Sequence, residues 1–127
     1  MRFTNFAEFD SSFPDDSVEH ENEIVAPDGE ALMRAISEQL REVGYFISGF
    51  DQHSFYGWTF EVVIPGKRCW LLLQRSDRWL LQVNDPPLIF GKPRFASFLD
   101  VCRKCLVAVP EISSVRWMTR KEFESQV

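Results

Sequence analysis

Long apolar runs are missing from this sequence of 127 residues, and so is a recognisable export signal. A transmembrane helix needs about 18 or more consecutive apolar residues, and no such run is present. The first ten residues, MRFTNFAEFD, lack the basic segment followed by a continuous apolar segment that a signal peptide requires. We therefore expect a soluble, cytoplasmic protein with no membrane partner.

Cysteine and histidine are scarce, which limits disulfide and metal chemistry. The three cysteines are an odd number in a chain without an export signal, so a disulfide framework is not expected. Cys102 and Cys105 form a Cys-x-x-Cys pattern, but both align with the apolar positions of a predicted helix. A free cysteine with this placement is usually a buried core residue. We predict core packing for this pair, no metal site and no cofactor.

Catalytic motifs are also absent. The sequence contains no glycine-rich phosphate loop, no HExxH zinc motif and no paired-cysteine ribbon. His53 lies two residues after Asp51, yet a lone histidine beside a carboxylate is more often a surface pair than a general base. We assign no catalytic residue. A small-ligand binder or enzyme that uses His53 and the aromatic residues of the strands remains an alternative.

Basic residues are almost absent from the N-terminal quarter of the chain. Residues 1–30 carry nine acidic residues against one basic residue, a net charge of −8, whereas residues 31–127 carry +3. Nucleic acid is not an expected partner, because phosphate binding needs a concentrated basic face. Clustered negative charge instead favours a basic protein surface. The predicted partner-binding residues are Asp15, Asp16, Glu19, Glu21 and Glu23.

The sequence does contain clear helical and strand patterns, one after another along the chain. An apolar stripe predicts a helix over residues 30–43, and a second helix is predicted from a cap at Ser97 to Val109. Strands are predicted at 45–51, 54–66, 68–75, 78–83 and 113–118, and a capping box at 119–122 opens a short helix. The fold class is α+β: an antiparallel meander of about four strands with two main helices on one face and a short C-terminal helix.

The chain is expected to form a single domain, 1–127, in which residues 1–29 are an acidic, partly irregular leader. Phe3, Phe6, Phe9 and Phe13 have the spacing of one side of a short helix. The remainder of the leader, up to Gly29, is rich in acidic residues, proline and serine and is predicted to be irregular. Asp28 is the predicted cap of the helix that follows.

The second face of the sheet is predicted to be partly apolar. Because side chains alternate along a strand, Trp70 and Leu71 cannot both face the helices. We predict an outer face that carries Trp70, Leu72 and Trp79. Large apolar patches rarely stay exposed to water, so this face, where the leader does not cover it, is expected to pair with a partner or with a second subunit in a homodimer.

In size, acidity, cytosolic character and lack of catalytic motifs, the sequence resembles the small bacterial immunity proteins, which neutralise a cognate toxin by occluding its active site. This resemblance implies a non-enzymatic protein-binding module that inhibits a partner protein. The order of helices and strands also resembles type III secretion chaperones, which are dimeric clamps for extended effector segments. The long segment before the first helix departs from the chaperone pattern.

Overall fold

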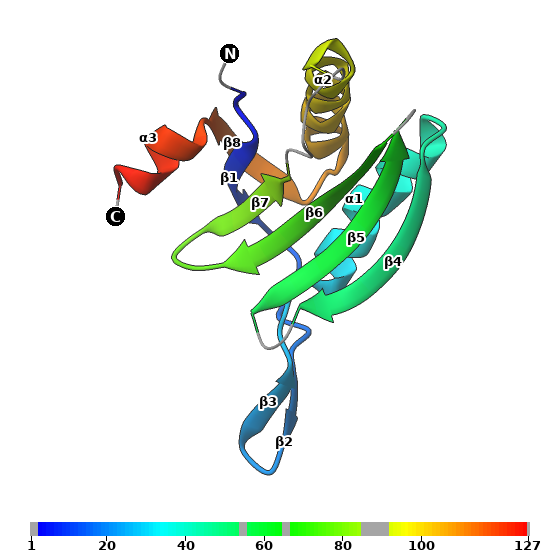
Figure 1. Ribbon diagram of the computed structural model, residues 1–127. Helices are drawn as coiled ribbons and strands as arrows, with labels where there is room; N and C mark the ends of the chain where they lie inside the picture. Colours follow the sequence, from blue (N-terminus) through cyan, green and yellow to red (C-terminus); the bar gives the residue numbers. More distant parts are fainter. Residues whose placement is uncertain (1–2, 54–55, 65–66, 85–91, 127) are drawn as a thin grey trace.

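The computed structural model describes residues 3–53, 56–64, 67–84 and 92–126. These residues form a six-stranded antiparallel sheet, a separate two-stranded hairpin and three helices (Figure 1). The elements are β1 (Phe6–Ser11), β2 (Val18–His20), β3 (Glu23–Ala26), α1 (Glu30–Glu42), β4 (Phe46–His53), β5 (Gly57–Ile64), β6 (Lys67–Arg75), β7 (Trp79–Val83), α2 (Lys92–Ala108), β8 (Ile112–Met118) and α3 (Arg120–Glu124). The α+β class is confirmed, but the sheet has six strands rather than about four.

The strand order is β4-β5-β6-β7-β1-β8, so the predicted meander forms two thirds of the sheet. The predicted strands of the meander are confirmed, although the first two and last two residues of the segment 54–66 lie outside the described residues. Among the described helices, none is both long enough and apolar enough to cross a bilayer.

The core lies between one face of the sheet and the two long helices (Figure 1). Alternate residues of the strands join the buried residues of α1 and α2 in one cluster, as alternation along a strand requires. The largest fully buried side chains of this cluster are Phe9, Phe60, Phe95, Phe98, Leu32, Met33, Ile36, Leu40, Leu71, Leu73, Leu81 and Leu99. Trp79 also belongs to this inner cluster, so its predicted place beside Trp70 and Leu72 on the outer face is wrong.

The predicted N-terminal helix is wrong, because Phe6 and Phe9 lie in an inner strand and Phe3 and Phe13 lie outside any helix. β1 pairs with β7 on one side and with β8 on the other. Ala7 and Phe9 face the core with no exposed surface, whereas Phe6 faces the opposite side and packs with Leu80 and Met118. The alternation of apolar residues with Glu8 and Asp10 was the strand signal in this segment.

Of the predicted helix caps, the one at the start of α3 is confirmed, and those at the starts of α1 and α2 are wrong. The capping box of α3 is confirmed, since Thr119 and Glu122 each accept a hydrogen bond from the backbone of the other. α2 starts at Lys92, five residues before the predicted cap at Ser97. Asp28 does not cap α1 and instead forms an ion pair with Arg75 at 2.6 Å.

The prediction that the cysteines pack in the core is confirmed. Cys69, Cys102 and Cys105 are all buried thiols, with 1%, 2% and 4% of their surface exposed. Burial raises the pKa of the Cys102 thiol well above its ordinary value, which disfavours the reactive thiolate. The described residues contain no group of three or more His, Cys, Asp or Glu side chains placed to hold a metal ion.

Candidate functional site

A bulge in β4 decides which side chains reach the outer face of the sheet, the face turned away from α1 and α2. Ser48 pairs with Glu61, but the next paired position joins Asp51 to Thr59, so β4 has one extra residue here. Gly49 lies inside the bulge with a φ of 63°, a left-handed conformation that favours glycine. One extra residue reverses the alternation of side chains beyond it.

The reversal turns Phe50 inward and Asp51 and His53 outward. The Phe50 ring lies against the core, with ring centroids 5.8 Å from Trp58 and 6.4 Å from Phe60. Arg34 of α1 covers the same ring at 4.2 Å. The sequence analysis missed this bulge, although a glycine within a strand pattern is a signal for one.

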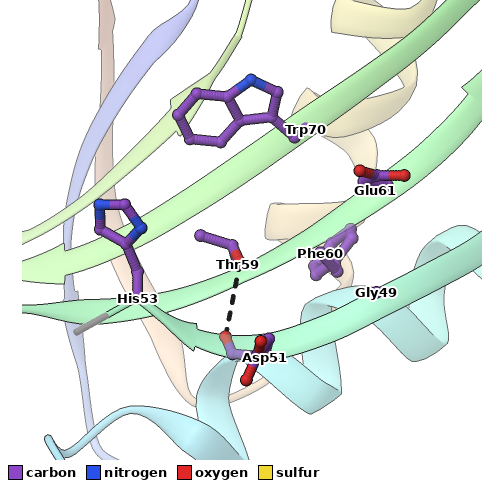
Figure 2. A pocket seen from close by; sticks show the side chains of 7 residues that line it. All are labelled: Gly49, Asp51, His53, Thr59, Phe60, Glu61 and Trp70. Atoms are coloured by element: carbon purple, nitrogen blue, oxygen red, sulfur yellow. Dashed lines mark hydrogen bonds between the residues drawn. The ribbon is translucent and has the colours of Figure 1, made fainter.

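An open pocket of 490 Å³ lies on the outer face where β4, β5 and β6 run side by side (Figure 2). Trp70 is 41% exposed and is the cross-strand neighbour of Glu61. Figure 2 shows Thr59 between Trp70 and His53, which agrees with the register of the three strands. The lining residues are Gly49, Asp51, His53, Thr59, Phe60, Glu61 and Trp70.

The pocket contains one histidine, His53, and one hydroxyl side chain, Thr59. General base catalysis needs a histidine held by a hydrogen-bond partner and close to a nucleophile. Within the described residues, the His53 side chain has no hydrogen bond to Asp51, whose carboxylate accepts one from the backbone N–H of Gln52 at 2.8 Å. The Thr59 hydroxyl is 3.5 Å from the Asp51 carbonyl oxygen, to which it donates a long hydrogen bond.

The second surface is the β2–β3 hairpin, residues 18–26, which projects from the body of the protein (Figure 1). We call it the acidic arm. Glu21 and Asn22 both have positive φ, 52° and 68°, and form a tight two-residue turn between the strands. The arm exposes three aliphatic side chains: Val18 at 53%, Ile24 at 48% and Val25 at 43%.

The base of the arm is fixed to the body by side chains from the sheet. Trp58 donates its indole N–H to the carbonyl of Pro27 at 3.1 Å, and Gln52 donates to the carbonyl of Val25 at 3.0 Å. An isolated two-stranded hairpin is marginally stable in water, so these contacts hold the arm in one orientation.

Asp16 also holds the base of the arm. Its carboxylate accepts hydrogen bonds from the backbone N–H groups of Gly29 at 2.7 Å and Ala31 at 2.9 Å. These groups lie at the start of α1, where backbone donors lack partners within the helix and negative charge is stabilising. Asp16 therefore caps α1 from a distant part of the chain.

The structure separates the acidic residues of the N-terminal segment by their contacts. Glu8 and Asp10 pair with Arg78, Asp28 pairs with Arg75, and Glu30 pairs with Arg34. In the described residues, by contrast, no lysine or arginine pairs with the carboxylates of the arm: Glu19, Glu21 and Glu23. Three of the five predicted partner-binding residues thus lie together on the arm, while Asp15 and Asp16 precede it.

Replacing Asp16 with alanine is expected to lower the free energy of unfolding by about 1 to 2 kcal/mol, because the start of α1 loses its cap. Urea denaturation measures this loss. The matched control is Asp15→Ala, since Asp15 is exposed and its hydrogen bonds are to Ser17, two residues along the chain, rather than to the start of α1. An equal effect of both substitutions would contradict the capping role of Asp16.

Comparison of the chain with protein-family models, curated proteins and solved structures finds no match. The acidic arm and the open pocket are the two surfaces from which a function can be argued. The same strand, β4, reaches both, because Gln52 bonds to the arm while Asp51 and His53 line the pocket on the opposite side of the strand.

Proposed function

We propose that this protein is a non-enzymatic binding module whose acidic arm recognises a basic surface on a partner protein. The observation that carries the proposal is the arm itself. It presents three carboxylates that pair with no lysine or arginine of the described chain, although Glu21 lies 3.9 Å from the imidazole of His20, beside three exposed aliphatic side chains. Apolar anchors beside unpaired charge are a common composition for a recognition surface.

The two kinds of side chain make different contributions to binding. Full burial of a valine or isoleucine side chain stabilises a complex by about 1.5 to 3 kcal/mol. The side chains of the arm are already half buried, so complete burial against a partner would contribute roughly half of that. The carboxylates mainly raise the association rate and select the partner. Because the base of the arm is already fixed, binding requires little further ordering of the chain.

We propose an immunity-type role in the bacterial cytoplasm, in which the arm enters and occludes a basic active-site cleft of a toxin. A projecting acidic hairpin has the shape and charge that such a cleft would accept. The chaperone-type alternative is less well supported, because both edge strands of the sheet are irregular. β4 has its bulge at Gly49, and β8 contains Ser114 with a φ of 55°. Irregular edges disfavour the addition of an extended segment to the sheet.

The test compares a neutralised arm with a neutralised control surface. The arm variant is Glu19→Gln/Glu21→Gln/Glu23→Gln. The control variant is Glu38→Gln/Glu42→Gln/Glu124→Gln, which removes the same charge from exposed positions elsewhere. The partner is isolated on tagged wild-type protein from the cell that naturally contains this chain, and the association rate of each variant is then measured.

The arm variant is expected to associate about ten-fold more slowly than wild type at low salt, because clustered charge steers the encounter. This difference should shrink as the salt concentration rises, since exposed charges are screened beyond about 8 Å at physiological ionic strength. Equal association rates of the arm and control variants at low salt would remove the arm from recognition.

A further inference from the structure

We infer that the open pocket on the outer face binds an arginine side chain of the partner protein. The inference rests on the proposed function, since it supplies a second point of contact for the same basic surface. The pocket combines an exposed indole face with two carboxylates from the adjacent strands, β4 and β5. A guanidinium group stacks on an aromatic face and pairs with carboxylates at the same time.

Trp70 provides the aromatic surface. Its exposed fraction of 41% contrasts with 8% for Trp58 and 6% for Trp79, which both lie in the core. Four other aromatic rings in the described part of the chain already have an arginine over them: Phe6, Phe50, Trp79 and Trp117. No arginine of the described residues lies over Trp70, so its ring is open to a cation from outside.

Asp51 and Glu61 provide the negative charge. Glu61 lies directly beside Trp70 across the strand pair, and Asp51 lies one pair further along β4. One oxygen of Glu61, Oε2, is 3.2 Å from the guanidinium of Arg68, and its other oxygen has no ion pair in the described residues. The residues that line the pocket include two carboxylates and neither lysine nor arginine.

The position of the pocket also fits the proposed partner. The strand that carries Asp51 and His53 contacts the acidic arm through Gln52, whose side chain reaches the Val25 carbonyl at 3.0 Å. The pocket and the base of the arm therefore share the same end of β4, with Asp51 and His53 on its outer side and Gln52 on its inner side. A basic protein that contacts the arm would bring further cationic side chains over the outer face.

The inference can be tested without the partner by titrating the full chain with short blocked peptides. The three probes are acetyl-Gly-Arg-Gly-amide, its citrulline analogue, which has the same shape without the charge, and its lysine analogue. The readout is the set of tryptophan indole N–H signals in nuclear magnetic resonance spectra, and Trp70→Phe identifies the signal of Trp70.

The arginine peptide is expected to shift the Trp70 signal saturably and to bind at least about five-fold more tightly than the citrulline peptide. An equal response to citrulline, or no saturable shift, would overturn the inference. Tighter binding of the lysine peptide would overturn the assignment to arginine. A Trp70 shift on raising the protein concentration alone would assign the face to a second copy of the chain instead.

Charge variants separate the pocket from the arm. Asp51→Asn/Glu61→Gln is expected to weaken binding of the arginine peptide by about ten-fold, because two attractive charges are removed. Glu38→Gln/Glu42→Gln is the matched control and should leave the peptide affinity unchanged. Unchanged affinity in the pocket variant would refute the role of the two carboxylates.

The arm variant completes the comparison, because it tests the proposed function independently of the pocket. If the arm variant loses partner association while wild type fails to bind the arginine peptide, only the pocket inference fails. If the peptide binds as expected while arm and control variants associate equally with the partner, the arm proposal fails and the pocket remains.

Discussion

Replacing Gly57 with alanine is expected to lower the free energy of unfolding by about 3 to 5 kcal/mol, which is large for one added methyl group. A Cβ at this position would overlap the carbonyl oxygen of Leu73 and lie 3.0 Å from its carbonyl carbon. These are backbone atoms of β6, which is paired on both sides, with β5 and with β7. They cannot move aside without disturbing the hydrogen-bonded ladder in the middle of the meander.

Urea denaturation of Gly57→Ala and Gly44→Ala separates this close contact from the general effect of losing a glycine. Gly44 has a φ of 99° and no atom within 4 Å of an added Cβ. Its substitution is therefore expected to cost only the strain of a left-handed backbone, about 1 to 2 kcal/mol. A smaller loss at Gly57 than at Gly44 would show that β5 and β6 are further apart than the structure has them.

The meander could be predicted from the sequence because its strands are neighbours along the chain. Each strand has its own apolar pattern, and short turns join them. The place of β1 could not be predicted in the same way. Its pairing with β7 and β8 joins residues that are far apart in the sequence, and the regular spacing of its phenylalanines also fits a helix. Tertiary pairing decided between the two patterns.

The facing of single residues depends on register, which a strand pattern alone does not give. Leu72 pairs with Gln82, so Leu80 and Gln82 face outward with it and Trp79 faces the core. The alternation of residues within β7 is enough to show that Trp79 lies on the opposite face from Leu80 and Gln82. The number of residues in the connection from β6 to β7 decides which set faces the core.

The candidate site was only partly predictable for the same reason. The cluster of acidic residues was visible in the sequence, but their contacts were not. Asp16 and Asp28 differ little in sequence context, yet one caps α1 and the other pairs with Arg75. The pocket depends on a single extra residue in β4, which brings Asp51 to the same face as Glu61.

Replacing Phe9 with alanine is expected to lower the free energy of unfolding by about 3 to 5 kcal/mol, because a fully buried aromatic side chain leaves a cavity in the core. Phe9 has no exposed surface and lies opposite Trp79 in the pairing of β1 with β7. The matched control is Phe46→Ala, which makes the same chemical change at a side chain that is 67% exposed. Its cost is expected to be within about 0.5 kcal/mol.

This pair of variants tests whether the N-terminal segment is part of the fold or a leader attached to it. A dispensable leader would tolerate Phe9→Ala as well as the exposed face tolerates Phe46→Ala, and equal urea midpoints would show this. An inner strand cannot tolerate it, because β8 is joined to the rest of the sheet only through β1 in the strand order. Loss of β1 would also displace Asp16 from the start of α1, which it caps, since Asp16 follows this strand by five residues. Phe9→Ala is therefore expected to destabilise the sheet and the base of the acidic arm together.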